Sequence, residues 1–111
     1  VAKDRAIESF MQVNKTFVIN ILREDNFQKM FRHFLKRFAP GADRFADVDI
    51  IEDLAKGGPV LSEALAFLDC KVISRLETPD HWIIYGIVEN GSVSDLTCKT
   101  AVHHRKVANH Y

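Results

Sequence analysis

The 111-residue sequence has no excess of charge of either sign and no long apolar run. Fifteen Lys and Arg residues balance fifteen Asp and Glu residues, so the net charge is zero with neutral histidines. A neutral chain has no overall field that would attract nucleic acid or an anionic membrane. A run of about 18 apolar residues, which a membrane-spanning helix needs, is absent. The sequence therefore predicts neither nucleic acid nor a membrane as a partner, and any anion site has to be local.

Cysteine is scarce, and the motifs of several large enzyme classes are missing. Cys70 and Cys98 have neither a CxxC partner nor a histidine at ligand spacing, and two thiols do not make a disulfide framework in a chain of this size. The sequence also has no GxGxxG, Walker, GxSxG or HExxH motif and no paired-carboxylate motif. Hydrolase and nucleoside-triphosphate chemistry therefore have no support. We expect reduced thiols in a cytoplasmic compartment, with Cys70 in the core.

What is present is the composition of one globular domain. Apolar residues make up 47% of the chain and charged residues 27%, which is typical of a folded protein with a single core. We therefore treat residues 1–111 as one domain. The opening residues Val1 to Asp4 are neither a signal peptide nor a transit peptide and look like the end of a strand. We expect a longer polypeptide with further strands before Val1.

The first half of the chain predicts two helices around one strand. Asp4 is a candidate N-cap of a short helix. Residues 16–22 are almost wholly apolar, which predicts a strand covered on both faces, and the single amide, Asn20, would need hydrogen-bond partners. Residues 26–38 carry an apolar stripe at helical spacing, and the acidic residues 43–58 predict mostly loop or short helix. The opposite face of the second helix is cationic and carries Lys29, Arg32, His33, Lys36 and Arg37.

The second half predicts an antiparallel sheet. Residues 68–76 alternate in polarity, Thr78-Pro79-Asp80 forms a turn, and residues 81–88 return as a second strand. Asn90-Gly91 is a two-residue turn signal, and residues 100–107 look like one more strand. The fold class is therefore α+β or mainly β, an antiparallel sheet with two helices in a barrel whose missing strands lie upstream.

Two polar clusters lie where predicted strands begin or end. Lys3, Asp4 and Arg5 stand at the junction of a strand and a helix start, where two cations and unpaired N–H groups could hold a phosphate. The alternative is a capped helix with solvated charges. His81 follows a turn and could donate to a carboxamide or a phosphate, or it could be a turn histidine bonded to Asp80 or to water.

A third cluster is His103-His104-Arg105-Lys106, on the last predicted strand. Strand alternation sends the two histidines to opposite faces, so they cannot easily share a metal ion. One face could offer an imidazole and a guanidinium to an anionic dinucleotide, and the alternative is a polar edge strand whose charge prevents aggregation. The cationic helix face could dock a membrane surface, a calmodulin-like groove or RNA, but the adjoining phenylalanine stripe favours a solvated face on a core helix.

Taken in order, seven segments resemble flavin reductase-like domains along the whole chain. The strings KDRA, FVINIL and DHWIIYGIVENG are similar to the general flavin reductase family, whereas TAVHHRK followed by NHY is similar to the flavodiiron proteins of cyanobacteria and green plastids. Each string is short, but their order is specific. The segments are residues 3–6, 17–22, 31–34 with 44–45, 58–61, 64–70, 80–82 and 100–106.

The resemblance implies an FMN-binding split barrel that takes a hydride from NAD(P)H, at the C-terminus of a protein that reduces dioxygen to water. A di-iron domain and a flavodoxin-like domain would precede it. The assembly would be a homodimer or a hetero-oligomer with a paralogue, in the cytoplasm or the plastid stroma. No side chain is implied as a nucleophile or general base. The positions carried over are Lys3, Arg5 and Asn20 for FMN and His81, His103, His104 and Arg105 for the NAD(P)H side.

The sequence departs from the family pattern at two places. Where the family has Gly-Asp-His, this chain has Pro79-Asp80-His81, and proline supplies neither an N–H nor a positive φ. The Ser/Thr-rich loop and the Pro-Pro turn that cradle flavin in the family are expected before Val1. The alternative function is therefore a non-catalytic dimerisation or interaction module that has lost cofactor binding.

Overall fold

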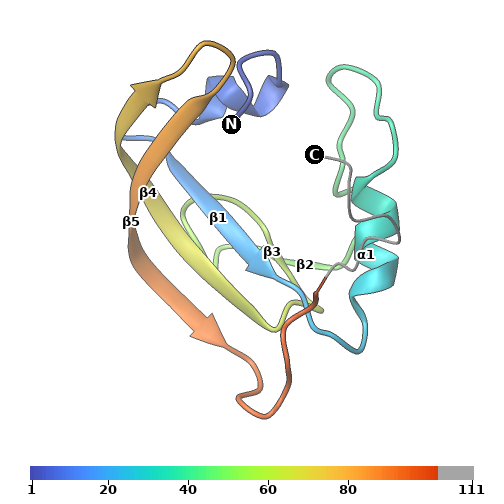
Figure 1. The fold of residues 1–111 in the computed structure, drawn as a ribbon. Helices are drawn as coiled ribbons and strands as arrows, with labels where there is room; N and C mark the ends of the chain where they lie inside the picture. The colour runs from blue at the N-terminus through green and yellow to red at the C-terminus, as the bar shows by residue number, and fades with distance from the viewer. Residues whose placement is uncertain (103–111) are drawn as a thin grey trace.

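The computed structural model describes residues 1–102 and shows a mostly β fold with one α-helix (Figure 1). The longest elements are the antiparallel strands β4 (Ala66–Glu77) and β5 (Trp82–Val93), and β4 also pairs with β1 (Thr16–Ile21), in the sheet order β1-β4-β5. Among the described residues neither sheet closes on itself, as the sequence predicted. The other elements are the 3-10 helix η1 (Ala6–Phe10), the helix α1 (Phe27–Phe34) and the paired strands β2 (Ile50–Ile51) and β3 (Val60–Leu61).

Strand β4 buries side chains on both of its faces. In the antiparallel register Phe17 lies opposite Cys70, and Val18 lies opposite Asp69. Since successive side chains of a strand point to opposite faces, the buried Cys70 and Asp69 lie on different sides of the sheet. The core position predicted for Cys70 is confirmed. Burial raises the pKa of this thiol, which therefore stays protonated at neutral pH.

A bulge near the open end of the hairpin, away from the turn, explains one failed prediction. The β4–β5 register shifts at Asp69, and Glu89 is the extra residue on β5. A bulge bends a strand without ending it. Residues 90–91 therefore continue β5 and pair with Asp69 and Leu68. The turn predicted at these residues is wrong, because the bulge absorbs the turn-forming sequence within the strand.

A second bulge changes which side chains share a face of β4. Val72 pairs with Gly86, whereas Ser74 pairs with Tyr85, so one residue of β4 between them is unpaired. Simple alternation puts Val72 and Ser74 on one face, but the bulge places them on opposite faces. Arg75 consequently projects from the same face as the fully buried Val72.

Both helices differ from their predictions at one end. The first is the five-residue 3-10 helix η1 with Arg5, not Asp4, at its N-cap and no side-chain cap bond. Helix α1 ends at Phe34, whereas the sequence predicted an end at residue 38. The residue after Phe34, Leu35, is 66% exposed and has no core to pack against. Met30 on the apolar stripe is buried in a core cluster, as predicted. No described helix is long and apolar enough to cross a membrane.

The segment between β2 and β3 is fixed against the sheet by one buried carboxylate. Asp69 is 4% exposed and accepts hydrogen bonds from the Lys56 amide at 2.7 Å and the Gly57 amide at 3.0 Å. A Cβ atom at Gly57 would lie 2.4 Å from the backbone carbonyl carbon of Phe17, so this approach requires glycine. Residues 43–58 form mostly loop, as predicted, apart from β2.

Strand β1 is covered less completely than its sequence predicts. Thr16 and Asn20 face the β2–β3 segment and bond to its backbone. On the opposite face Ile19 is 44% exposed. The expectation of a strand covered on both faces is therefore wrong within the described residues, where nothing packs fully over that side chain.

Candidate functional site at the end of the hairpin

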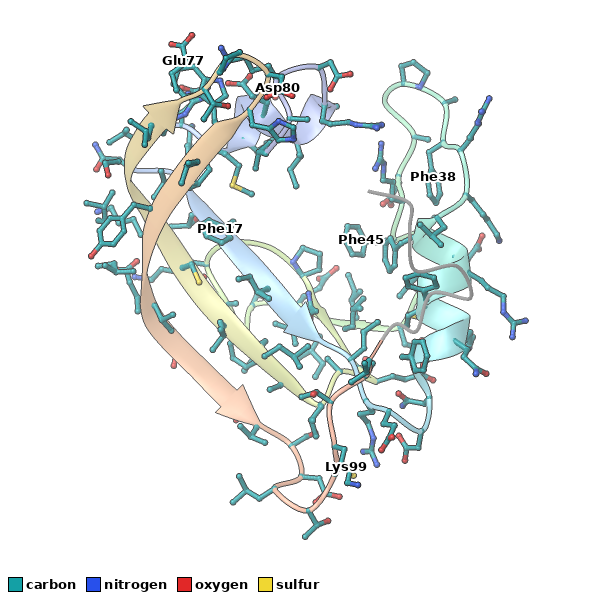
Figure 2. The ribbon with its side chains drawn as sticks, viewed as in Figure 1. Phe17, Phe38, Phe45, Glu77, Asp80 and Lys99 are labelled. Carbon is teal, nitrogen blue, oxygen red and sulfur yellow. The ribbon has the colours of Figure 1, made fainter. Side chains whose placement is uncertain are left out.

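Separate segments of the chain meet at the end of the β4–β5 hairpin. Ala2 forms an antiparallel bridge with His81, and Val1 and Trp82 exchange backbone hydrogen bonds of 2.8 and 2.7 Å. The Lys3 amide donates to the Asp80 carbonyl at 3.0 Å. Figure 2 shows the turn residue Asp80 at this end of the molecule, beside η1. The backbones of two predicted site residues, Lys3 and His81, therefore lie at the same end of the hairpin, and strand alternation sends their side chains to opposite faces.

The turn that carries His81 closes through a threonine. The Thr78 hydroxyl accepts a hydrogen bond from the His81 amide at 3.0 Å, and the Thr78 amide donates to the His81 carbonyl at 2.9 Å. Pro79 lies inside this turn. The turn is therefore complete without a backbone donor at the position where the family has glycine.

Two cations stand beside this turn in different states. The Lys3 ammonium lies 2.7 Å from a Glu77 carboxylate oxygen, and its side chain is 31% exposed. The Arg5 side chain is 75% exposed and has only a 3.9 Å contact with Asp4 among the ion pairs of the described residues. Arg5 is therefore available to an anion, whereas Lys3 already has an anionic partner. Sequence reasoning missed Glu77, because only the pairing of residues 1–3 with residues 80–82 brings Lys3 next to it.

The His81 ring has one neighbour of opposite charge. Its Nδ1 atom lies 3.0 Å from the Asp80 carboxylate, and the histidine side chain is 53% exposed. The hydrogen bond and charge of His81 lower the pKa of the Asp80 carboxyl. This contact is the one expected of a turn histidine, while the exposed ring is also open to a ligand.

A buried arginine ties the hairpin to η1. The Arg75 side chain is 11% exposed, donates to Glu8 at 2.5 Å and donates to the Gln12 side chain. Its guanidinium carbon lies 4.0 Å from the centre of the Trp82 ring, and the Lys3 ammonium lies 5.3 Å from the same centre. Simple alternation places Arg75 on the wrong face of β4, so no local pattern predicts this contact.

One further predicted site residue, Asn20, is not brought to the hairpin end. Asn20 lies opposite Phe67 on β1, accepts a hydrogen bond from the Leu61 amide at 2.8 Å and donates to the Pro59 carbonyl at 3.3 Å. Phe67 and Glu77 are ten residues apart on β4, or about 30 Å at the usual rise of a strand. The buried-amide partners predicted for Asn20 are therefore backbone groups. His103, His104 and Arg105 lie outside the described residues.

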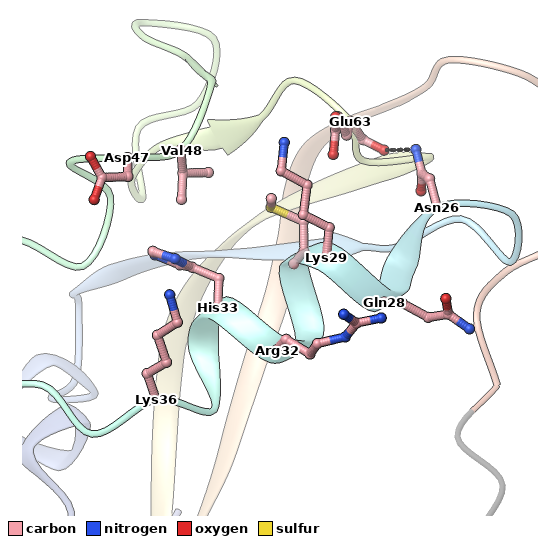
Figure 3. Close-up of a pocket in the computed structure, with 10 residues that line it drawn as sticks. Asn26, Gln28, Lys29, Arg32, His33, Lys36, Asp47, Val48 and Glu63 are labelled. Carbon is pink, nitrogen blue, oxygen red and sulfur yellow. Dashed lines mark hydrogen bonds between the residues drawn. The ribbon is translucent and has the colours of Figure 1, made fainter.

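The cationic face of α1 borders an open groove of about 720 Å³ (Figure 3). Lys29, Arg32 and Lys36 line it together with acidic Asp47 and Glu63. None of these three cations has an ion pair within the described part of the chain. The apolar stripe on the other side of the helix packs into the core through Met30 and Phe34.

The fold and the sequence together define a family. Residues 1–109 match the model of the flavin reductase like domain, and the chain belongs to this family. It is 59% identical over all 111 residues to Diflavin flavoprotein A 1 of Synechocystis sp.. The chain spans about a fifth of the length of the curated relatives it matches, 19% in this case.

Solved flavin reductases show the same fold. The NADH:FAD oxidoreductase SgcE6 of Streptomyces globisporus superposes with a TM-score of 0.74 at 27% identity, over 90% of this chain and 58% of SgcE6. The same enzyme in complex with NAD and FAD fragments superposes with a TM-score of 0.73 at 26% identity over the same shares. The predicted flavin reductase-like fold is therefore confirmed.

Proposed function

We propose that residues 1–111 are part of one domain that binds FMN and passes on electrons received from NAD(P)H. The observation that carries this proposal is the backbone pairing of residues 1–3 with residues 80–82, which brings Lys3, Arg5 and His81 to one end of the hairpin. Membership of the flavin reductase family supports it, as does SgcE6, a relative in fold that is described with NAD and FAD fragments.

The residues at this end fit the anionic part of a flavin nucleotide. Arg5 presents an exposed guanidinium, and Lys3 presents an ammonium that can exchange Glu77 for a phosphate oxygen. When bound, FMN supplies the redox chemistry. Lys3 and Arg5 hold its phosphate, and His81 orients the nicotinamide nucleotide. His103, His104 and Arg105 as NAD(P)H contacts complete the proposed site, whereas Asn20, whose amide bonds to the backbone of Pro59 and Leu61, lies outside it.

We propose the wider setting from the relatives. The domain would serve a longer diflavin flavoprotein with a di-iron domain, which reduces dioxygen to water. The protein would form a homodimer or a hetero-oligomer with a paralogue, in the cytoplasm or the plastid stroma. This longer protein is called the full-length protein below. Its flavin site in the present domain is the one whose flavin binding is lost when residues 1–111 are deleted.

The second candidate is a non-catalytic interaction module. Two observations favour it. The Lys3 ammonium is already paired with the Glu77 carboxylate, and Pro79 stands where the family has glycine. A module predicts that deletion of residues 1–111 removes a protein contact and no flavin. An electron-transfer domain predicts that it removes one flavin and the NAD(P)H-dependent reduction of that flavin.

Glu77→Gln should raise the affinity for FMN. The Glu77 carboxylate competes with the phosphate for the Lys3 ammonium and repels the phosphate, so its neutralisation should lower the Kd about threefold to tenfold at low salt. Fluorescence titration of the full-length protein measures this Kd. Glu89→Gln removes the same charge from β5, far from the turn, and should leave this Kd unchanged. A weaker affinity in Glu77→Gln would show that the phosphate does not use Lys3.

His81→Ala should slow the reduction of the flavin by NAD(P)H by about 10-fold or more, as expected for the loss of one well-placed hydrogen bond. FMN affinity should stay within about twofold, because the residue acts on the nicotinamide side. Rapid-mixing absorbance measures the reduction rate, and Asp80→Asn serves as a control for the turn. An unchanged rate with reduced stability would assign His81 to the turn alone.

A further inference from the structure

We propose that Arg75, which does not reach the ligand, positions Lys3 and Arg5 for the flavin phosphate and so determines how much of the binding depends on that phosphate. This inference rests on the proposed function. Its structural basis is a closed set of contacts among Arg75, Glu8 and Gln12, between the hairpin and η1.

The two phosphate-site cations lie between two anchors. Upstream, Val1 and Trp82 exchange backbone hydrogen bonds. Downstream, Glu8 is bound by Arg75, and its amide donates to the Arg5 carbonyl at 3.0 Å. If the downstream anchor is removed, the next tie of this segment to the sheet is the backbone pairing of residues 14 and 15 with Val72, so the cations are held at one end by a much longer stretch of chain. Directed binding of a phosphate requires that both cations be held in place.

The Arg75 contact is of the kind that fixes a segment. The Arg75 and Glu8 side chains are 11% and 25% exposed, so water screens their attraction much less than it would at an open surface. Among the described residues the Nε atom of Arg75 is buried without a hydrogen-bond partner, while its two terminal nitrogens donate to Glu8 in η1 and to Gln12 just after η1. The guanidinium carbon also lies 4.0 Å from the centre of the Trp82 ring, and Trp82 is the residue whose backbone forms the upstream anchor.

The test compares FMN with riboflavin, which lacks the phosphate. The quantity measured is the ratio of the riboflavin Kd to the FMN Kd for this domain's flavin site in the full-length protein. In Arg75→Met the ratio should fall about 10-fold, while the riboflavin Kd changes by less than about threefold, because only the phosphate contribution depends on the two cations. Arg75→Lys keeps the charge but cannot bond to Glu8 and Gln12 at the same time, so the ratio should fall nearly as far in this variant.

Glu8→Ala separates positioning from simple charge. Removing a carboxylate makes the site more positive, so a through-space effect would increase the ratio of the two Kd values. Loss of the anchor should decrease it instead, and the Arg75→Met/Glu8→Ala double variant should be no worse than Arg75→Met alone. Val48→Ala, in the core beside α1, is the control that lowers stability without changing the ratio.

The outcomes distinguish the two levels of the proposal. A lower ratio in Arg75→Met, Arg75→Lys and Glu8→Ala supports the positioning role. A wild-type ratio in these variants, or a raised ratio in Glu8→Ala, overturns it while leaving flavin binding intact. A wild-type protein whose flavin content does not depend on residues 1–111 overturns the proposed function and the positioning role together.

Discussion

Replacing both Lys3 and Arg5 by alanine should weaken FMN binding to this domain by about 100-fold or more. Each cation offers one charge-assisted hydrogen bond to the phosphate, worth about 1.5 kcal/mol or more, and about 1.4 kcal/mol corresponds to a factor of ten in Kd. Riboflavin binding should barely change, because it has no phosphate. Fluorescence titration of the full-length protein with both flavins measures the effect.

The matched control for this loss is Lys29→Ala/Arg32→Ala, which removes two cations from the face of α1. Its FMN affinity should equal that of the wild type. The control also tests the hypothesis that α1 is a basic binding helix. That hypothesis predicts salt-sensitive RNA or lipid binding that these substitutions abolish. Equal losses of FMN affinity in both double variants would place the phosphate elsewhere or make the attraction non-specific.

Gly57→Ala should cause a large local loss of stability, about 3 kcal/mol, at the upper end of what overpacking usually costs. The added Cβ would lie 2.4 Å from the carbonyl carbon and 2.6 Å from the Cα and the nitrogen of Phe17, all backbone atoms that cannot rotate away. Moving the segment to relieve the clash would break the hydrogen bonds from residues 56 and 57 to Asp69. Hydrogen exchange of β1 and β4, measured by mass spectrometry on the full-length protein, reports the loss.

Gly41→Ala is the control, because this glycine has φ +78° and nothing within 4 Å of an added Cβ. It tests backbone conformation without a clash and should cost about 1 kcal/mol, confined to its own loop. If Gly57→Ala leaves the exchange of β1 unchanged, the close approach of the two backbones does not stabilise this part of the fold.

The hairpin was predictable from the sequence because its signals are local. Residues 68–76 alternate in polarity and a turn sequence separates them from the returning strand; residues 68–76 lie within β4 and residues 82–88 within β5. The two bulges were not predictable, since each depends on the partner strand. They extended β5 through residues 90–91 and moved Arg75 to the buried face.

The candidate site was predictable in part for the same reason. Lys3 lies next to a strand end and His81 lies next to a turn, and both features can be predicted from the local sequence. Glu77 and Arg75 were missed, because their neighbours come from the N-terminal segment and only the tertiary fold sets those contacts. The partners of Asn20 are also set by the tertiary fold. Its amide forms hydrogen bonds with the backbone of Pro59 and Leu61, which no local pattern predicts.

The flavin content of the full-length protein tests the central claim most directly. Flavin released by denaturation would be counted per polypeptide for the wild type and for the same protein without residues 1–111, each saturated with FMN and then freed of excess. We predict one flavin more per polypeptide in the wild type, and loss of that flavin in Lys3→Ala/Arg5→Ala at low FMN concentration. Equal flavin content in the wild type and the deletion variant would contradict a flavin site in this domain.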